Sequence, residues 1–137
     1  MPGVYRKAAI RDYRPGDEPL LFGLARLDRG ADERTLAVLE RETVFVAEVE
    51  GGAAGYVACV REGASLRVDQ LFVSPEHEAE GVGTQLLEYV EGFAISQGAA
   101  RLRIVVERDN DRARRFYVGR GFAVVSDDVL ELVLPQT

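Results

Sequence analysis

Three consecutive apolar strands joined by two tight turns constrain the fold more than any other feature of the sequence. The strands are expected at Thr43–Val49, Ala54–Val60 and Ser65–Val73, and the turns at Glu50-Gly51-Gly52 and Arg61-Glu62-Gly63. Links of two to four residues cannot join parallel neighbours in a sheet. These strands are therefore expected to form an antiparallel meander.

The second half of the chain alternates strands and helices. The elements expected there are a helix from Val82 to about Gln97, a strand at Leu102–Val106, a helix from Asn110 to about Arg120, and strands at Phe122–Val125 and Val129–Leu134. A helix between two strands permits a parallel crossover. The pattern predicts a mixed α/β fold whose central sheet has about seven strands.

The first forty residues are expected to add one strand and two helices. The strand is placed at Val4–Ile10, a helix capped by Asp17 runs through Leu27, and a weaker helix runs from Asp32 to about Glu42. These helices bring the expected number to about four. A chain of 137 residues has the length of one ordinary domain, so one domain is expected over residues 1–137.

Composition argues against several classes of function. Seventeen basic and twenty-three acidic residues give a net charge of −6 at pH 7, whereas nucleic-acid binders usually carry an excess of basic charge. One cysteine, Cys59, and one histidine, His77, argue against a disulfide framework or a metal site. Residues 1–7 lack the apolar core of a secretion signal, and the longest uncharged stretch, Gly51–Val60, is far shorter than a membrane span. We expect a cytoplasmic protein without metal, nucleic acid or membrane partners.

The first candidate site lies where the third strand passes into the long helix. Gly81 and Gly83 open that helix, where backbone N–H groups have no intrahelical acceptor and the helix dipole adds partial positive charge. This pattern is typical of a phosphate site, and the alternative is that both glycines only permit a tight turn and close packing. The third glycine of a dinucleotide fingerprint and the Gly-Lys-Ser/Thr of a Walker loop are both missing.

The second candidate site is the helix that follows Asn110. Asn110 is a favourable N-cap, and Ala113, Phe116 and Tyr117 share one helical face. Taken alone, Tyr117 is interpreted as a core aromatic residue whose hydroxyl lies at the rim of the core.

With these two sites, the sequence resembles the GCN5-related N-acetyltransferase family. The resemblance rests on the order of elements, on the loop with Val73, Pro75 and Glu76 before Gly81-x-Gly83, and on the helix motif. The helix motif comprises Asn110, Ala113, Phe116, Tyr117, Gly121 and Phe122. The resemblance implies an enzyme that uses acetyl-CoA as acyl donor and acetylates a primary amine of a small molecule or peptide. It also allows a homodimer.

The resemblance implies a role for each motif residue. Backbone groups of Leu71, Phe72 and Val73 would pair with the pantetheine arm of acetyl-CoA. The pyrophosphate would rest on the N–H groups of Glu78, Ala79, Glu80, Gly81, Val82, Gly83 and Thr84. Asn110 and Ala113 would flank the thioester and the cofactor arm, and Tyr117 would protonate the departing thiolate. For the general base, Asp69 is the first candidate and Glu107 the second.

The loop departs from the family pattern in its charge. The family usually has Arg or Gln where Glu78 stands, often a glycine in place of Ala79, and often a basic residue in place of Glu80. Carboxylates beside a pyrophosphate would weaken its binding. Two hypotheses therefore stand: an active acetyltransferase, or a binding module of the same fold that has lost cofactor affinity. Basic residues that could offset the acids lie at Arg108, Arg112, Arg114 and Arg115, which are otherwise a solvated helix face partly paired with Glu78 and Glu80.

Overall fold

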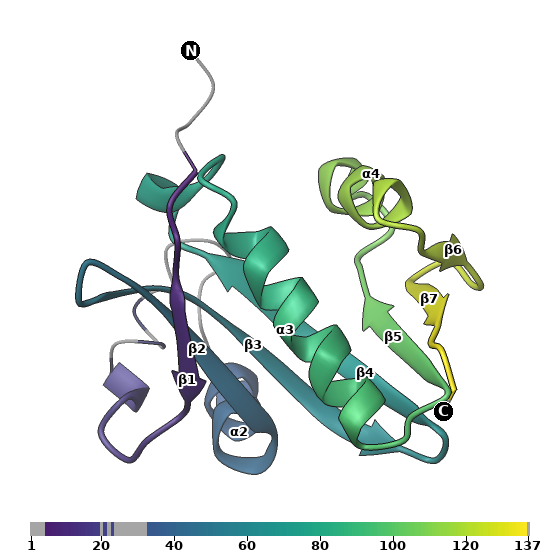
Figure 1. The fold of residues 1–137 in the computed structure, drawn as a ribbon, viewed down its shortest axis with the longest axis horizontal. Coiled ribbons are helices and arrows are strands. Elements are labelled where there is room, and N and C mark those ends of the chain that lie inside the picture. The colour runs from purple at the N-terminus through teal and green to yellow at the C-terminus, as the bar shows by residue number, and fades with distance from the viewer. Residues whose placement is uncertain (1–4, 20, 22, 24–32, 137) are drawn as a thin grey trace. The chain divides into compact units, whose positions relative to one another are not determined.

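The structure, a computed structural model, describes residues 5–19, 21, 23 and 33–136. Its strands form a seven-stranded mixed sheet with the order β1-β2-β3-β4-β5-β7-β6 (Figure 1). The strands are β1 (Ala9–Asp12), β2 (Thr43–Val49), β3 (Gly52–Glu62), β4 (Ser65–Val73), β5 (Arg101–Val105), β6 (Ala123–Val124) and β7 (Val129–Val133). The helices are α2 (Glu33–Arg41), the 3₁₀ turn η1 (Pro75–His77), α3 (Val82–Ser96) and α4 (Asp111–Gly119).

The expected α/β class and seven-stranded sheet are confirmed. Three α-helices have bounds within the described residues, and the additional helix expected from Asp17 to Leu27 lies largely outside them. Contacts group the chain into two compact units, Met1–Cys59 with Gln70–Val90, and Val60–Asp69 with Glu91–Thr137. No helix among the described residues is both long and apolar enough to span a bilayer.

The first unit contains the hairpin of β2 and β3. Glu50 and Gly51, with φ of 53° and 83°, form the two-residue turn between these strands. Left-handed residues in such a turn match the twist of an antiparallel pair. Thr43 pairs with Cys59 at one end of the ladder and Val49 with Gly52 at the other, so the predicted hairpin is confirmed.

Side chains of β2 alternate between α2 and α3. Val44 and Val46 belong to a buried cluster that includes Leu39 of α2. Phe45, between them, packs edge-on against Tyr89 of α3, with ring centroids 4.9 Å apart. Because successive strand residues point to opposite faces, α2 and α3 cover opposite faces of this hairpin.

The first strand differs from the expected Val4–Ile10, because β1 starts at Ala9 and pairs with β2. Before β1, the Arg6 amide donates to the Glu80 carbonyl at 2.9 Å, and the Ala8 amide donates to Oε1 of Gln85 at 2.9 Å. The chain therefore makes its hydrogen bonds with the loop and α3 before it joins the sheet. A pattern of apolar residues does not show to which element the backbone of an extended segment is hydrogen-bonded.

The second unit contains the parallel and C-terminal pairs of the sheet. Ser65–Val68 of β4 pair in parallel with Arg101–Ile104 of β5, which confirms the crossover expected through the long helix. Strand β7 pairs antiparallel with both β5 and β6. Glu131 of β7 also binds Nε of Arg101 and of Arg103, at 3.2 and 2.8 Å, so ion pairs join β7 to β5.

Near the start of the chain, Asp17 holds a turn together. Its carboxylate receives hydrogen bonds from Nη1 and Nη2 of Arg11, at 2.8 and 3.0 Å, and from the Arg14 amide at 2.7 Å. The Arg11 hydrogen bond is the largest cause that lowers the pKa of Asp17 below its ordinary value. A lowered folded-state pKa stabilises the fold above the unfolded pKa, about 3.9, and this stabilisation is lost as the pH falls through the folded value.

We expect Asp17→Asn to lower the free energy of unfolding by about 1–2 kcal/mol at neutral pH, because a charge-assisted hydrogen-bond pair is lost. The difference should shrink as the pH falls through the lowered pKa of Asp17, because the wild-type carboxyl then becomes protonated. Urea denaturation over a series of pH values measures the effect. An equal loss at every pH would contradict the role of the charge.

Candidate active site

The end of β4 is unusual because it extends beyond its ladder with β5. The register covers Ser65–Val68, and Asp69–Val73 continue past it. Toward β3, the Ser74 amide donates to the Ala54 carbonyl at 2.7 Å. A Cβ on the next residue, Gly55, would overlap the carbonyl oxygen of Phe72, so only glycine allows this approach of the two backbones. The expected cofactor strand, Leu71–Val73, is thus fixed through β3.

The loop after β4 turns sharply before α3. Ser74 is buried, η1 follows, and Ala79 and Gly81 adopt left-handed φ values of 65° and 82°. Alanine is strained in this region, whereas glycine is not. Gly81 has a second constraint, because a Cβ there would lie 2.8 Å from the ring of Tyr5. The loop is therefore held in a defined conformation that brings the chain to the helix start.

The first turn of α3 presents backbone donors. Gln85 is the first residue of this helix whose amide binds back along the chain, to the Gly81 carbonyl at 3.1 Å. Helix geometry leaves the amides of Val82, Gly83 and Thr84 without intrahelical acceptors, and the helix dipole makes this end partly positive. A Cβ on Gly83 would lie 3.5 Å from Cγ2 of Val73, an ordinary contact, so packing does not require glycine there. Gly83 therefore places no side chain beside these amides.

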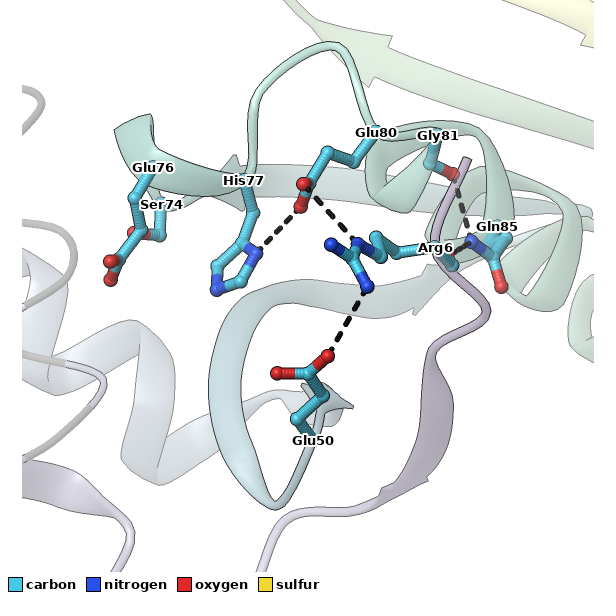
Figure 2. A network of polar contacts seen from close by, with 8 residues as sticks. All are labelled: Arg6, Glu50, Ser74, Glu76, His77, Glu80, Gly81 and Gln85. Carbon is cyan, nitrogen blue, oxygen red and sulfur yellow. Dashed lines mark hydrogen bonds and ion pairs between the residues drawn. The ribbon is translucent and has the colours of Figure 1, made fainter. Parts of the chain in front are cut away.

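A polar network holds the loop of residues 74–80, called the acidic loop below because it contains three glutamates (Figure 2). Nδ1 of His77 lies 2.8 Å from Oε1 of Glu80, and because a carboxylate only accepts, this nitrogen donates. Nε of Arg6 lies 3.7 Å from Oε2 of Glu80, and Nη1 of Arg6 lies 3.2 Å from Oε1 of Glu50. The charge of Glu80 is therefore compensated by an arginine from outside the loop.

Gln85 ties the N-terminal segment to the same loop. Its Nε2 donates to the carbonyl of Arg6 at 2.7 Å and to that of Gly81 at 3.2 Å, while its Oε1 accepts from the Ala8 amide. Figure 2 shows the Gln85 amide beside the backbone of Arg6 and Gly81. The segment before β1 and the start of α3 are thus joined through one side chain.

In the second unit, α4 presents the other predicted motif. Oδ1 of Asn110 accepts from the Ala113 amide at 3.2 Å, which confirms the predicted N-cap. Tyr117 is 6% exposed, and its ring packs edge-on against Phe116 and Phe122, with centroids 5.2 and 5.7 Å away. The Tyr117 ring is therefore packed between residues of α4 and of the segment that follows it.

Several charged residues of the second unit pair with one another. Both carboxylate oxygens of Asp69 accept hydrogen bonds from Arg67, at 2.7 Å from Nε and 3.1 Å from Nη2. Glu107, the other base candidate, is exposed. In the basic cluster, Arg108 pairs with the carboxylate of Asp127 at 3.3 Å, and Arg114 donates to its carbonyl at 2.8 Å. For Glu80, the described ion pairs are with Arg6 and His77.

The model of the acetyltransferase (GNAT) family matches residues 7–122. The chain belongs to the GNAT family. An uncharacterized N-acetyltransferase of Archaeoglobus fulgidus is 35% identical over 88 residues, which are 59% of this GNAT chain and 60% of that protein. The match thus spans less than two thirds of the relative's length.

Solved structures share the GNAT fold with this chain. Ard1 from Thermoplasma volcanium superposes with a TM-score of 0.83 at 21% identity, covering 94% of this chain and 99% of that one. The PaiA N-acetyltransferase from Thermoplasma acidophilum, solved in complex with coenzyme A, gives a TM-score of 0.77 at 17% identity, covering 93% and 99%. At these identities the likeness concerns the fold.

The residues predicted from the GNAT resemblance fall into two groups. The first unit brings together Leu71–Val73, the loop from Glu78 to Glu80 and the helix start from Gly81 to Thr84. The second unit holds Asp69, Asn110, Ala113 and Tyr117. Sequence reasoning missed Arg6, Gln85 and Gly55, whose partners are distant in the sequence, and the pairing of His77 with Glu80. The pairing of His77 with Glu80 could have been predicted from the sequence, because the two residues lie three positions apart in one short loop.

Proposed function

We propose that this GNAT protein transfers the acetyl group of acetyl-CoA to a primary amine of a small molecule or peptide, by direct attack in a ternary complex. The observation that carries the proposal is the start of α3, where Gly83 places no side chain beside the backbone donors of a partly positive helix end. The space that a Cβ on Gly83 would fill suits the close approach of a pyrophosphate. The coenzyme A complex of a structural neighbour supports the choice of donor.

Each part of the proposed site has one task. The amides of Val82, Gly83 and Thr84 at the start of α3 hold the pyrophosphate, and the backbone of Leu71–Val73, beyond the β5 ladder, pairs with the pantetheine arm. The amides of Glu78 and Glu80 already donate to the carbonyls of Pro75 and His77, at 3.3 and 3.4 Å. Asn110 and Ala113 flank the thioester end. Holding the amine against the thioester removes much of the entropic part of the barrier, on the order of 7–11 kcal/mol in favourable cases.

The proposed reaction moves one acetyl group and one proton. The neutral amine attacks the thioester carbonyl, a C–N bond forms, and the C–S bond breaks. Asp69, or Glu107 as the alternative, accepts the amine proton through water, and Tyr117 gives a proton to the CoA thiolate. The buried ring of Tyr117 supports this assignment, since a general acid must be held in one position.

Calorimetric titration with acetyl-CoA, beside 3′-dephospho-acetyl-CoA, tests the proposal. Binding with a micromolar Kd is expected, because the helix amides bind the pyrophosphate and Arg6 offsets Glu80. A weaker Kd for the dephospho form would place the 3′-phosphate near a basic side chain. Absence of binding at millimolar acetyl-CoA would overturn the proposal and favour a binding module without cofactor affinity.

Gly83→Ala separates cofactor binding from stability. The new methyl group would make an ordinary contact with Val73, so the free energy of unfolding should stay within about 0.5 kcal/mol of wild type. The affinity for acetyl-CoA should fall about tenfold, because the methyl group lies where the phosphate approaches the helix amides. Urea denaturation and calorimetry measure the two effects.

Gly92→Ala in the same helix is the matched control. Nothing lies within 4 Å of a Cβ built on Gly92, and the residue is exposed. Alanine should stabilise the helix there by about 0.5–1 kcal/mol and leave acetyl-CoA affinity unchanged. Unchanged affinity in Gly83→Ala as well would contradict the proposed pyrophosphate site.

A further inference from the structure

Arg6 belongs to the N-terminal segment, yet its side chain lies against the acidic loop (Figure 2). We propose that Arg6 is a positioning residue for acetyl-CoA, which compensates the charge of Glu80 and so permits phosphate binding at the neighbouring helix start. The proposal rests on the proposed function, since it concerns the same site. In this proposal the loop has no lysine or arginine of its own, and Arg6, which is distant in the sequence, supplies the positive charge.

The backbone of Arg6 is fixed to the loop independently of its side chain. Its amide donates to the carbonyl of Glu80 at 2.9 Å, and its carbonyl accepts from Nε2 of Gln85 at 2.7 Å. The ring of the preceding residue, Tyr5, covers Gly81. The guanidinium is therefore delivered to the loop by main-chain contacts that remain when the side chain is changed.

The loop has no lysine or arginine of its own to offset its acidic side chains. Glu76, Glu78 and Glu80 precede α3, and residues 74–100 contain no lysine or arginine. The side chain of Glu80 is only 19% exposed, so its field is screened less by water than that of an exposed carboxylate. Without compensation it would repel the phosphates of the donor.

Arg6 and His77 contribute differently to this compensation. His77 donates a hydrogen bond to Oε1 of Glu80, whereas Arg6 brings a permanent positive charge to Oε2. Glu50, whose side chain is 77% exposed, binds the other end of the guanidinium and holds it in place. The guanidinium of Arg6 thus lies between the carboxylates of Glu50 and Glu80, and its pair with Glu80 is the one next to the helix start.

A double-mutant cycle tests the inference by calorimetric titration with acetyl-CoA. Arg6→Gln should weaken binding about tenfold at low salt, because Glu80 is then uncompensated, and the deficit should shrink at high salt. Glu80→Gln should bind at least as tightly as wild type. The double variant should return to within about threefold of wild type, since the repelling charge is gone.

Lys7→Gln is the matched control, because it makes the same change of net charge one residue away, at an exposed side chain. It should change the affinity less than about twofold, and the thermal midpoints of all variants should agree within a few degrees. A double variant as weak as Arg6→Gln, or an Arg6→Gln deficit that salt does not reduce, would overturn the inference. If Arg6→Gln binds like wild type, this inference alone fails, whereas a wild-type protein that does not bind acetyl-CoA overturns the proposed function itself.

Discussion

Replacement of Tyr117 by phenylalanine is expected to lower the turnover of acetyl transfer on the order of 100-fold. The ring that packs against Phe116 and Phe122 is retained, and the hydroxyl, the proposed proton donor for the CoA thiolate, is removed. The Kd for acetyl-CoA should therefore stay near wild type. Turnover is measured as release of the CoA thiol, with the amine that wild type acetylates fastest in a panel of small amines and short peptides.

Tyr89→Phe provides the comparison for this experiment. It removes a tyrosine hydroxyl from an exposed residue of α3 and preserves the edge-on contact with Phe45. Its turnover should equal that of wild type. If Tyr117→Phe also turns over at the wild-type rate, the assignment of Tyr117 as general acid is wrong.

Gly55→Ala is expected to cost about 3 kcal/mol of unfolding free energy or more. Its methyl group would overlap the carbonyl oxygen of Phe72, and it would also lie 3.3 Å from Cδ1 of Leu86. Backbone atoms cannot yield as a flexible side chain does, so β4 must shift where it carries Leu71–Val73. Acetyl-CoA affinity should fall together with stability, and urea denaturation with calorimetry measures both.

The control for this position lies at the start of the same strand. A Cβ on Gly52 would meet only the Val49 carbonyl, at 3.8 Å, so Gly52→Ala should change stability by less than about 0.5 kcal/mol. A loss below about 1 kcal/mol in Gly55→Ala would show that β3 and β4 separate easily. The close approach would then not fix the cofactor strand.

Local patterns predicted the elements of this fold well. The turn at Glu50-Gly51, the helix that starts at Val82 and the cap at Asn110 are each set by neighbours in the sequence, and the structure confirms all three. The first strand starts later than expected, because Arg6 and Ala8 before it bind Glu80 and Gln85 instead of β2. Such a choice depends on tertiary contacts that no local pattern contains.

Only those parts of the candidate site that depend on local sequence could be predicted. Gly81 and Gly83 are recognisable from their spacing, but the sequence presents Glu80 only as a repelling charge. Its pairing with Arg6 depends on how the N-terminal segment folds back, and the need for glycine at position 55 depends on the backbone of β4. Residues that act across strands carry no periodic signal.

The amide group of Gln85 acts in this structure as a substitute for a strand neighbour. It accepts from the backbone at Ala8 and donates to it at Arg6, as an adjoining strand would, and it also binds the Gly81 carbonyl. We therefore expect the N-terminal segment and the loop to open together in local unfolding. Hydrogen exchange at the amides of Arg6 and Ala8 would then report on openings of the loop.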